Sequence, residues 1–266
     1  MSWTLLTNDD GIDSPALAPF AAALARTRQV RVIVPDRERS WIGKAITRHD
    51  PVFTERREVA GLEAFTCTGY PADAVQIGIH ALSDDPPELV VSGINLGYNH
   101  GAAFLMSSGT VGAAVESWIS GVPSVAISVG AMTDWPAWRA AVLAPSAAAG
   151  WGRTADLCAG ILDDVQVSDA LDHCDVVSIN LPFDPPPGTA RRVTGIARVG
   201  YDRLFRADGP GRFVHDFGGG IREYGTLIGS DVEAANLGQI AITPVRLPTA
   251  AGLPDVIKHS LEQMER

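Results

Sequence analysis

The sequence predicts an α/β protein with a Rossmann-like, mostly parallel sheet that carries helices on both faces. Short apolar runs bounded by turn residues alternate with longer segments of helical period, which is the pattern of a parallel sheet covered on both sides. Of the 266 residues, 46% are apolar and 20% are charged, which is the composition of a globular chain and not of a disordered one. This length favours one large domain, or one domain with an appendage.

The first elements along the chain are a predicted strand and a predicted helix. The apolar run at residues 3–7 precedes a polar stretch at residues 8–13. Ser14 and Pro15 are expected to be the N-cap and the first residue of a helix, because these residue types favour those positions. The apolar stripe of this helix comprises Leu17, Phe20, Ala21 and Leu24.

Later apolar runs continue the same alternation of strands and helices. Strands are predicted at residues 30–34, 89–92, 124–129, 176–179 and 240–243. Helices are predicted at residues 110–119 and 145–167. The stripe of the first of these helices comprises Val111, Ala114, Val115 and Trp118. A last helix near the carboxyl terminus is predicted from the stripe Leu253, Ile257, Leu261 and Met264.

Composition divides the chain into three predicted parts. Residues 1–182 are expected to form the Rossmann-like domain. Residues 183–229 carry a run of three prolines, a run of three glycines and scattered arginines with little period, which predicts a protruding arm that joins subunits. Residues 230–266 are expected to return to the body as a strand and a helix.

The balance of charges excludes one class of partner. The chain has 31 acidic and 21 basic side chains, which gives a formal net charge of −10. Polymeric nucleic acid is therefore not an expected partner, because a protein that binds it needs a basic surface. A phosphate held by so acidic a chain needs a local positive potential, either from a metal ion or from backbone amides.

A cytoplasmic location without contact to a membrane is expected. The amino terminus lacks a basic region followed by an apolar one, and the uncharged run at residues 117–133 is broken by glycine and proline. Cys67, Cys158 and Cys174 are odd in number and contain no C-x-x-C pair, so they are expected to be reduced, buried thiols.

Polar residues follow three predicted strands, at the edge of the sheet where ligands bind in open α/β folds. Asp9 and Asp10 come after the first strand, Ser40 after the second and Asn95 after the third. Two adjacent carboxylates repel each other, and a divalent cation would offset that repulsion. Together these oxygen atoms suit Mg²⁺, Mn²⁺ or Ca²⁺. The alternative is that each residue occupies an ordinary turn, with an aspartate capping the helix that follows.

A second cluster predicts an anion site. Ser108, Gly109 and Thr110 precede or begin the predicted helix at residues 110–119, whose free amides and dipole attract a phosphate. Asn99 is expected to donate to the same anion. The alternative is that Ser108 or Thr110 only caps the helix. The sequence lacks a P-loop, a dinucleotide fingerprint and a hydrolase serine elbow.

Several motifs, taken in their order along the chain, resemble those of the SurE survival-protein family of nucleoside-monophosphate phosphatases. The opening stretch Leu6-Thr7-Asn8-Asp9-Asp10-Gly11 is similar to the start of that family. The other similar blocks are residues 35–40, 69–73, 92–99 and 108–114, with looser similarity at residues 180–182, 230–231 and 242–244.

The resemblance implies one divalent metal ion, Mg²⁺ or Mn²⁺, held by Asp9, Asp10, Ser40 and Asn95. It also implies hydrolysis of nucleoside 5′- or 3′-monophosphates and a homodimer or homotetramer joined through the arm. Asp9 is the predicted catalytic residue. Its expected role is that of a metal ligand and not of a base or nucleophile, because two carboxylates that share a cation have a depressed affinity for protons.

A second hypothesis is a nucleotide-binding regulatory module that uses the same pocket without turnover. It is motivated by three departures from the family pattern: Trp41 replaces a small residue, Lys44 a frequent histidine and Tyr70 a usual threonine. Release of phosphate from nucleoside monophosphates separates the two hypotheses.

Overall fold

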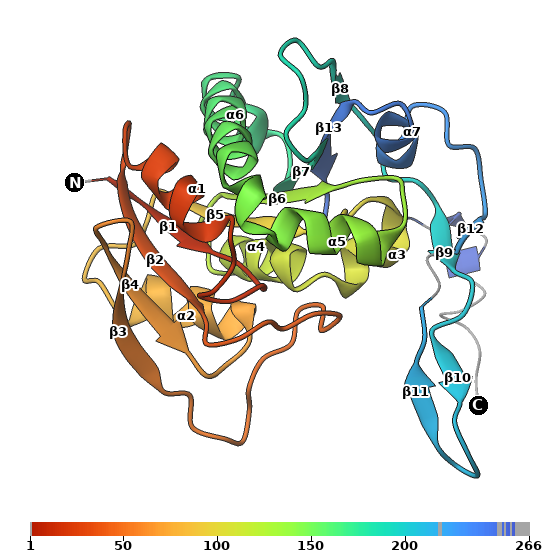
Figure 1. The fold of residues 1–266 in the computed structure, drawn as a ribbon, viewed down its shortest axis with the longest axis horizontal. Coiled ribbons are helices and arrows are strands. Elements are labelled where there is room, and N and C mark those ends of the chain that lie inside the picture. The colour runs from red at the N-terminus through yellow and green to blue at the C-terminus, as the bar shows by residue number, and fades with distance from the viewer. Residues whose placement is uncertain (1, 218–219, 249–251, 253, 256, 259–266) are drawn as a thin grey trace.

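A nine-stranded sheet forms the centre of the molecule, and helices cover both of its faces (Figure 1). The computed structural model describes residues 2–217, 220–248, 252, 254–255 and 257–258. From edge to edge the strands are β3 (Thr54–Val59), β4 (Leu62–Cys67), β2 (Gln29–Pro35), β1 (Trp3–Thr7), β5 (Leu89–Leu96), β6 (Ser124–Gly130), β7 (Val176–Pro182), β13 (Ile240–Val245) and β8 (Arg191–Val193).

Neighbouring strands from β4 to β7 are all parallel, whereas β3 and β13 pair antiparallel with β4 and β7. Every residue of β1, β5 and β6 is buried, as expected for strands covered on both faces. The predicted Rossmann-like, mostly parallel α/β sheet is therefore confirmed.

Two helix pairs form the outer layers. The helices α1 (Leu17–Leu24) and α6 (Ala148–Val167) pack together on one face, and α2 (Pro71–His80) and α4 (Gly109–Ile119) on the other (Figure 1). The shorter helices are α3 (Gly101–Ser107), α5 (Trp135–Leu143), α7 (Asp231–Asn236), η1 (Pro145–Ala147) and η2 (Ala170–Asp172). No helix within the described residues combines the length and apolar character needed to span a membrane.

The ends of two elements differ from the prediction. Helix α1 begins after Ala16, where its first backbone bond runs from Phe20 N to Ala16 O, so Ser14 does not cap it. Strand β5 continues past Ser92 to Leu96, because its pairing with β6 shifts and then resumes at Asn95.

The buried face of α4 also differs from the prediction. Trp118 is 42% exposed, although it was expected in the apolar stripe. Glu116 and Ser117 are buried in its place, since this end of α4 packs toward α2, where Gln76 donates to Glu116. Of the predicted carboxy-terminal stripe, Leu253, Leu261 and Met264 lie outside the described residues.

The cysteines follow the prediction with one exception. Cys67 and Cys158 are buried, whereas Cys174 is only half-buried, and all three are free thiols.

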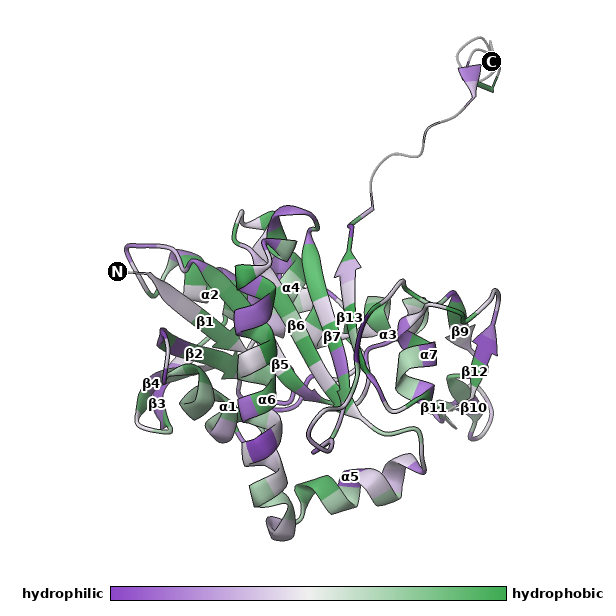
Figure 2. Cartoon of the chain, turned by 90° about the horizontal axis from the view of Figure 1, so that it is seen from above, coloured by the Kyte–Doolittle hydropathy of each residue, from purple (hydrophilic) through white to green (hydrophobic). Residues whose placement is uncertain are grey.

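Residues 183–229 contain both a strand of the main sheet and a projection from the body. Strand β8 pairs with β13, whereas β9 (Val199–Tyr201) pairs with β12 (Ile221–Glu223) and β10 (Phe205–Ala207) pairs with β11 (Phe213–His215). The β10–β11 hairpin extends away from the sheet (Figure 1), and in the view from above these strands lie beyond α3 and α7 (Figure 2).

Asp231 fixes the base of this projection to the body. Its carboxylate is 1% exposed and accepts from Gly101 N at 2.7 Å and Ala197 N at 2.9 Å. We expect Asp231→Ala to lower the free energy of unfolding by about 2–4 kcal/mol, because buried N–H groups would lose their charged acceptor. Urea denaturation measures this loss. The control is Asp208→Ala in the exposed hairpin, for which we expect a change below about 1 kcal/mol; equal losses would contradict the assigned role.

Candidate active site

The two acidic residues of the predicted metal site lie where β1 ends, between β2 and β5. The chain leaves β1 toward β2 on one side and later returns to β5 on the other, so this is the point at which the strand order reverses. Ligands bind at such a point in open α/β sheets. Asp9 is 6% exposed and Asp10 is half-buried.

Asp9 connects the ends of three elements. Its Oδ1 accepts a hydrogen bond from Thr110 Oγ1 at 2.6 Å, and its backbone carbonyl accepts from Arg39 N at 2.7 Å. Gly109, the first residue of α4, packs directly against it: a Cβ added there would lie 2.9 Å from Asp9 Oδ2 and 3.2 Å from the Arg39 carbonyl oxygen. The start of α4 and the loop after β2 are therefore held against this carboxylate.

Asp10 is tied to the end of β5. Its Oδ2 accepts from Leu96 N at 3.0 Å, directly after Asn95. The side-chain nitrogen of Asn95 donates to the Gly97 carbonyl at 2.7 Å, so the amide oxygen is the atom of this side chain that could serve a metal ion. The end of β1, which Asp9 and Asp10 follow, and the end of β5, which carries Asn95, therefore lie side by side at one edge of the sheet.

Ser40 reaches the same edge through its neighbour. The bond from Arg39 N places the Ser40 backbone one residue away from the contact with Asp9. The exposed Ser40 hydroxyl itself donates to Glu38 Oε1 at 2.7 Å, so the structure gives it a different partner from the predicted metal set.

The predicted phosphate-binding residues take three different positions. Ser108 caps α4, because its hydroxyl accepts from Val111 N at 3.1 Å, which leaves the Gly109 and Thr110 amides at the start of the helix. The Thr110 hydroxyl, fully buried, is used to hold Asp9. Asn99 is 7% exposed, and its side-chain nitrogen donates to Ser128 Oγ at 2.8 Å. The backbone amides at the start of α4 are the remaining donors of the predicted anion site, and that of Thr110 is directed at the Asp9 carboxylate.

The electrostatics of the acidic pair are unfavourable for two bare carboxylates. Burial raises the pKa of Asp9 to about 6, and the hydrogen bond from Thr110 opposes part of that rise. Burial, followed by the charge of Asp9, raises the pKa of Asp10 well above its ordinary value. The negative charge of Glu38 raises both pKa values further. A cation among these oxygen atoms would relieve the repulsion.

The donor set fits a hard divalent ion. Asp9, Asp10, Asn95 and Ser40 offer only oxygen ligands, which suit Mg²⁺ or Mn²⁺ better than zinc. Within the described residues, no three His, Cys, Asp or Glu side chains gather as a metal cluster. The predicted ligand set therefore has two acidic members, Asp9 and Asp10, and two neutral ones.

Sequence reasoning missed two residues that influence the site. Arg139 of α5 forms an ion pair with Glu38 at 2.8 Å, and its positive charge lowers the pKa of Asp10. Glu38 lies in the loop after β2, which the sequence predicted to be near the site, but its effect on the pKa of Asp9 and Asp10 was not predicted. Arg139 was missed because no helix was predicted over Trp135–Leu143.

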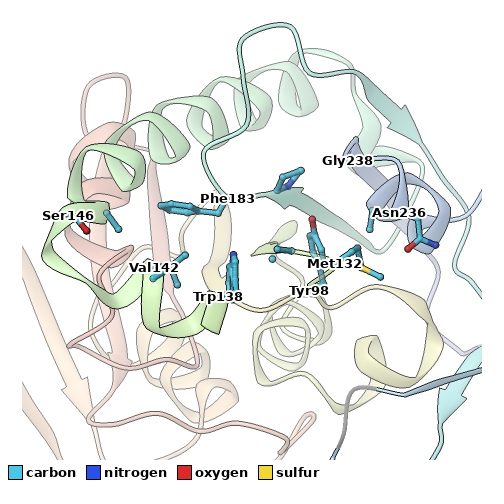
Figure 3. A pocket seen from close by; sticks show the side chains of 14 residues that line it. Tyr98, Met132, Trp138, Val142, Ser146, Phe183, Asn236 and Gly238 are labelled. Carbon is cyan, nitrogen blue, oxygen red and sulfur yellow. The ribbon is translucent and has the colours of Figure 1, made fainter. Parts of the chain in front are cut away.

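A cavity of about 570 Å³ lies beyond the carboxyl ends of β6 and β7 (Figure 3). Its walls come from the loop after β5, from α5 and η1, from the end of β7 and from α7. The lining residues are Tyr98, Gly130, Ala131, Met132, Trp138, Ala141, Val142, Ser146, Ala147, Pro182, Phe183, Ala235, Asn236 and Gly238.

An open, mostly parallel sheet with a carboxylate pair at its point of reversal places the protein among the Rossmann-like α/β proteins with an acidic ligand site at the carboxyl edge. The profile of the survival protein SurE matches residues 4–204. The chain therefore belongs to the SurE family, and the resemblance drawn from the sequence motifs is confirmed.

Individual relatives support this membership. The chain is 34% identical to the 5′-nucleotidase SurE of Geobacter sulfurreducens over 243 residues, which cover 91% of this chain and 87% of the relative. It is 48% identical over 124 residues, 47% of each chain, to the 5′-nucleotidase SurE of Methanopyrus kandleri. The crystal structure of the SurE protein from Aquifex aeolicus superposes with a TM-score of 0.69 at 27% identity, covering 98% of this chain and 99% of that one.

Proposed function

We propose that this protein is a metal-dependent 5′-nucleotidase, a phosphomonoesterase that converts nucleoside monophosphates to nucleoside and phosphate. The proposal includes 3′-monophosphates, which present the same phosphate group. The observation that carries it is the adjacent carboxylate pair Asp9 and Asp10, of which the buried Asp9 is held against the start of α4 and Asp10 against the end of β5. The names of relatives that are at least 30% identical over most of the chain support the nucleotidase activity.

Four side chains would hold the metal ion: Asp9, Asp10, Asn95 and Ser40. When bound, a divalent ion supplies a Lewis acid that offsets charge on the phosphoryl oxygens. For Ser40 this requires its hydroxyl to turn away from Glu38, which an exposed serine rotamer permits.

The protein's own groups bind and orient the phosphate. The amides at Gly109 and Thr110 lie at the positive end of the α4 dipole, which attracts the phosphate to this end of the helix. Thr110 acts as a positioning residue, since its hydroxyl fixes the rotamer of Asp9. Because Asp9 is almost fully buried, little water competes for its hydrogen bond with Thr110.

A panel of nucleotides tests the proposal directly. Purified protein is incubated with the 5′- and 3′-monophosphates of all four ribonucleosides, with Mg²⁺, with Mn²⁺ or with EDTA, and released phosphate is measured. We expect release that needs the metal and scales with protein concentration, with EDTA lowering the rate by at least about 10²-fold, since the metal supplies most of the charge stabilisation.

Absence of release under every condition would contradict the proposal. Metal-dependent nucleotide binding without release would instead identify the regulatory module.

The proposal also includes a cytoplasmic location and a homodimer or homotetramer joined through the arm at residues 183–229. Free cysteines support a reducing compartment. Exposed apolar side chains on the β10–β11 hairpin support an assembly surface, because Phe205 is 57% and Phe213 is 66% exposed.

A further inference from the structure

Three aromatic rings line the cavity beyond β6 and β7, and each of them packs against a neighbouring residue outside the cavity. The Tyr98 ring lies between Gly130 and the stacked ring of His100, with ring centroids 4.9 Å apart. Phe183 packs edge-on against the buried Trp151 at 4.7 Å. Trp138 lies 5.2 Å from Trp135. All three rings remain half-buried, and Figure 3 shows that they converge on one space.

This space has the size and the chemistry of a site for a flat, uncharged group. Its volume of about 570 Å³ lies within the range of roughly 300–1,000 Å³ that is usual for small-molecule sites. None of the described residues that line it is charged. The Tyr98 hydroxyl and the Asn236 amide add polar groups at its wall, which Figure 3 shows on the side away from Ser146.

Two segments link the wall of the cavity to the acidic site: the loop after β5 and helix α5. Tyr98 follows Asn95 by three positions, and Gly97 between them packs against the Trp135 ring, which a Cβ at Gly97 would meet at 3.1 Å. Helix α5 carries Trp138 toward the cavity and Arg139 toward Glu38 and Asp10. One short helix therefore borders both spaces.

We propose that this cavity binds the nucleobase of the substrate, with the base against Trp138, Phe183 and Tyr98 while the phosphate occupies the acidic site. The inference rests on the proposed nucleotidase function and deepens it by assigning the base. Aromatic rings accept every base, because each base has a π-face, so the site favours nucleotides over other phosphomonoesters without selecting strongly among bases.

A second aromatic cluster offers a rival position for the base. Trp41 follows Ser40 and lies 5.4 Å from Phe217 and 6.0 Å from Phe104. These rings already contact one another and Tyr201, which fastens the projecting segment to α3 through a hydrogen bond to the Ala103 carbonyl. The cluster is packed ring against ring, whereas the proposed base site is an open cavity.

The test compares a substrate that has a base with one that lacks it. KM and kcat are measured with AMP and with ribose 5-phosphate for the wild type, Trp138→Ala, Trp138→Phe, Trp41→Ala and the control Trp118→Ala. We expect Trp138→Ala to raise KM for AMP about tenfold, in line with the loss of one base–ring contact, and to change kcat/KM for ribose 5-phosphate less than about twofold. Trp138→Phe is expected to restore most of the affinity. Trp118→Ala, on the far end of α4, is expected to behave as wild type.

A binding measurement separates this inference from the proposed function. We expect adenosine to quench tryptophan fluorescence in the wild type and in Trp118→Ala, and not in Trp138→Ala. Equal losses for both substrates in Trp138→Ala, or no loss for either, would overturn the assignment, as would a loss confined to AMP in Trp41→Ala. If the wild type releases no phosphate from any substrate, the proposed function fails while adenosine binding still decides the base site.

Discussion

Replacing Asp9 by asparagine is expected to lower kcat/KM for nucleoside monophosphates by at least about 10³-fold, which corresponds to roughly 4 kcal/mol of transition-state stabilisation. Asparagine keeps the shape of the side chain and can still accept the hydrogen bond from Thr110 Oγ1. It removes one of the two negative charges that would hold the metal ion. Phosphate release at saturating Mg²⁺ or Mn²⁺ measures the effect.

The same substitution is expected to stabilise the metal-free protein at neutral and alkaline pH. Burial raises the pKa of Asp9 from 3.8 to about 6, so the folded state binds this proton more readily than the unfolded state. The charged carboxylate therefore destabilises the fold fully above about pH 6, and this penalty disappears as the pH falls through 6 toward 3.8. In EDTA, Asp9→Asn should exceed the wild type by about 1–3 kcal/mol at pH 8, and the difference should vanish near pH 4.

A matched control is available in the same loop, between β1 and α1. Asp13 is exposed, so Asp13→Asn is expected to leave activity and stability at pH 8 unchanged. Full activity of Asp9→Asn with added Mg²⁺ or Mn²⁺ would exclude Asp9 as a ligand. A stability difference that persisted at pH 4 would show that the substitution acts through packing and not through charge.

The substitution is expected to lower activity and to raise the stability of the metal-free protein. These opposite effects explain why two adjacent carboxylates could be predicted as a functional site from the sequence. Adjacent carboxylates at the end of a buried strand cost stability, so the sequence of Asp9 and Asp10 favours the hypothesis of a cation site over that of an ordinary turn. The parallel-strand pattern then fixes the edge at which Asn95 joins them, because β1 and β5 are neighbours. The strands β1 and β5 could be predicted from short apolar runs alone, because strands that are buried on both faces consist almost entirely of apolar residues.

Other features depended on tertiary contacts that have no local signal. Strand β3 is polar and exposed except for Val59, and only its pairing with β4 makes it a strand. The roles of Asn99 and Thr110 were predicted from their position near an anion site, whereas their side chains are committed to Ser128 and Asp9. A hydroxyl or amide in a loop can satisfy several partners, and its choice is set by neighbours that are distant in sequence.

Gly109→Ala is expected to reduce kcat/KM by about 10²-fold without unfolding the protein, because misplacing catalytic groups by about 1 Å has costs of this size. The added Cβ would lie 2.9 Å from both Cβ and Oδ2 of Asp9, so the carboxylate or the start of α4 must shift. Helix propensity acts the other way, since alanine is favoured over glycine in a helix by about 0.5–1 kcal/mol.

Gly160→Ala in α6 separates these two contributions. No atom lies within 4 Å of a Cβ at Gly160, so this variant should gain about 0.5–1 kcal/mol of stability and keep full activity. Thermal denaturation and phosphate release are measured on both variants. If Gly109→Ala is as active as Gly160→Ala, the contact between α4 and Asp9 does not control catalysis, and the close approach of the anion site to the carboxylate pair is only a packing constraint. If Gly109→Ala alone loses activity while remaining folded, the distance between the two sites is itself a requirement of the reaction.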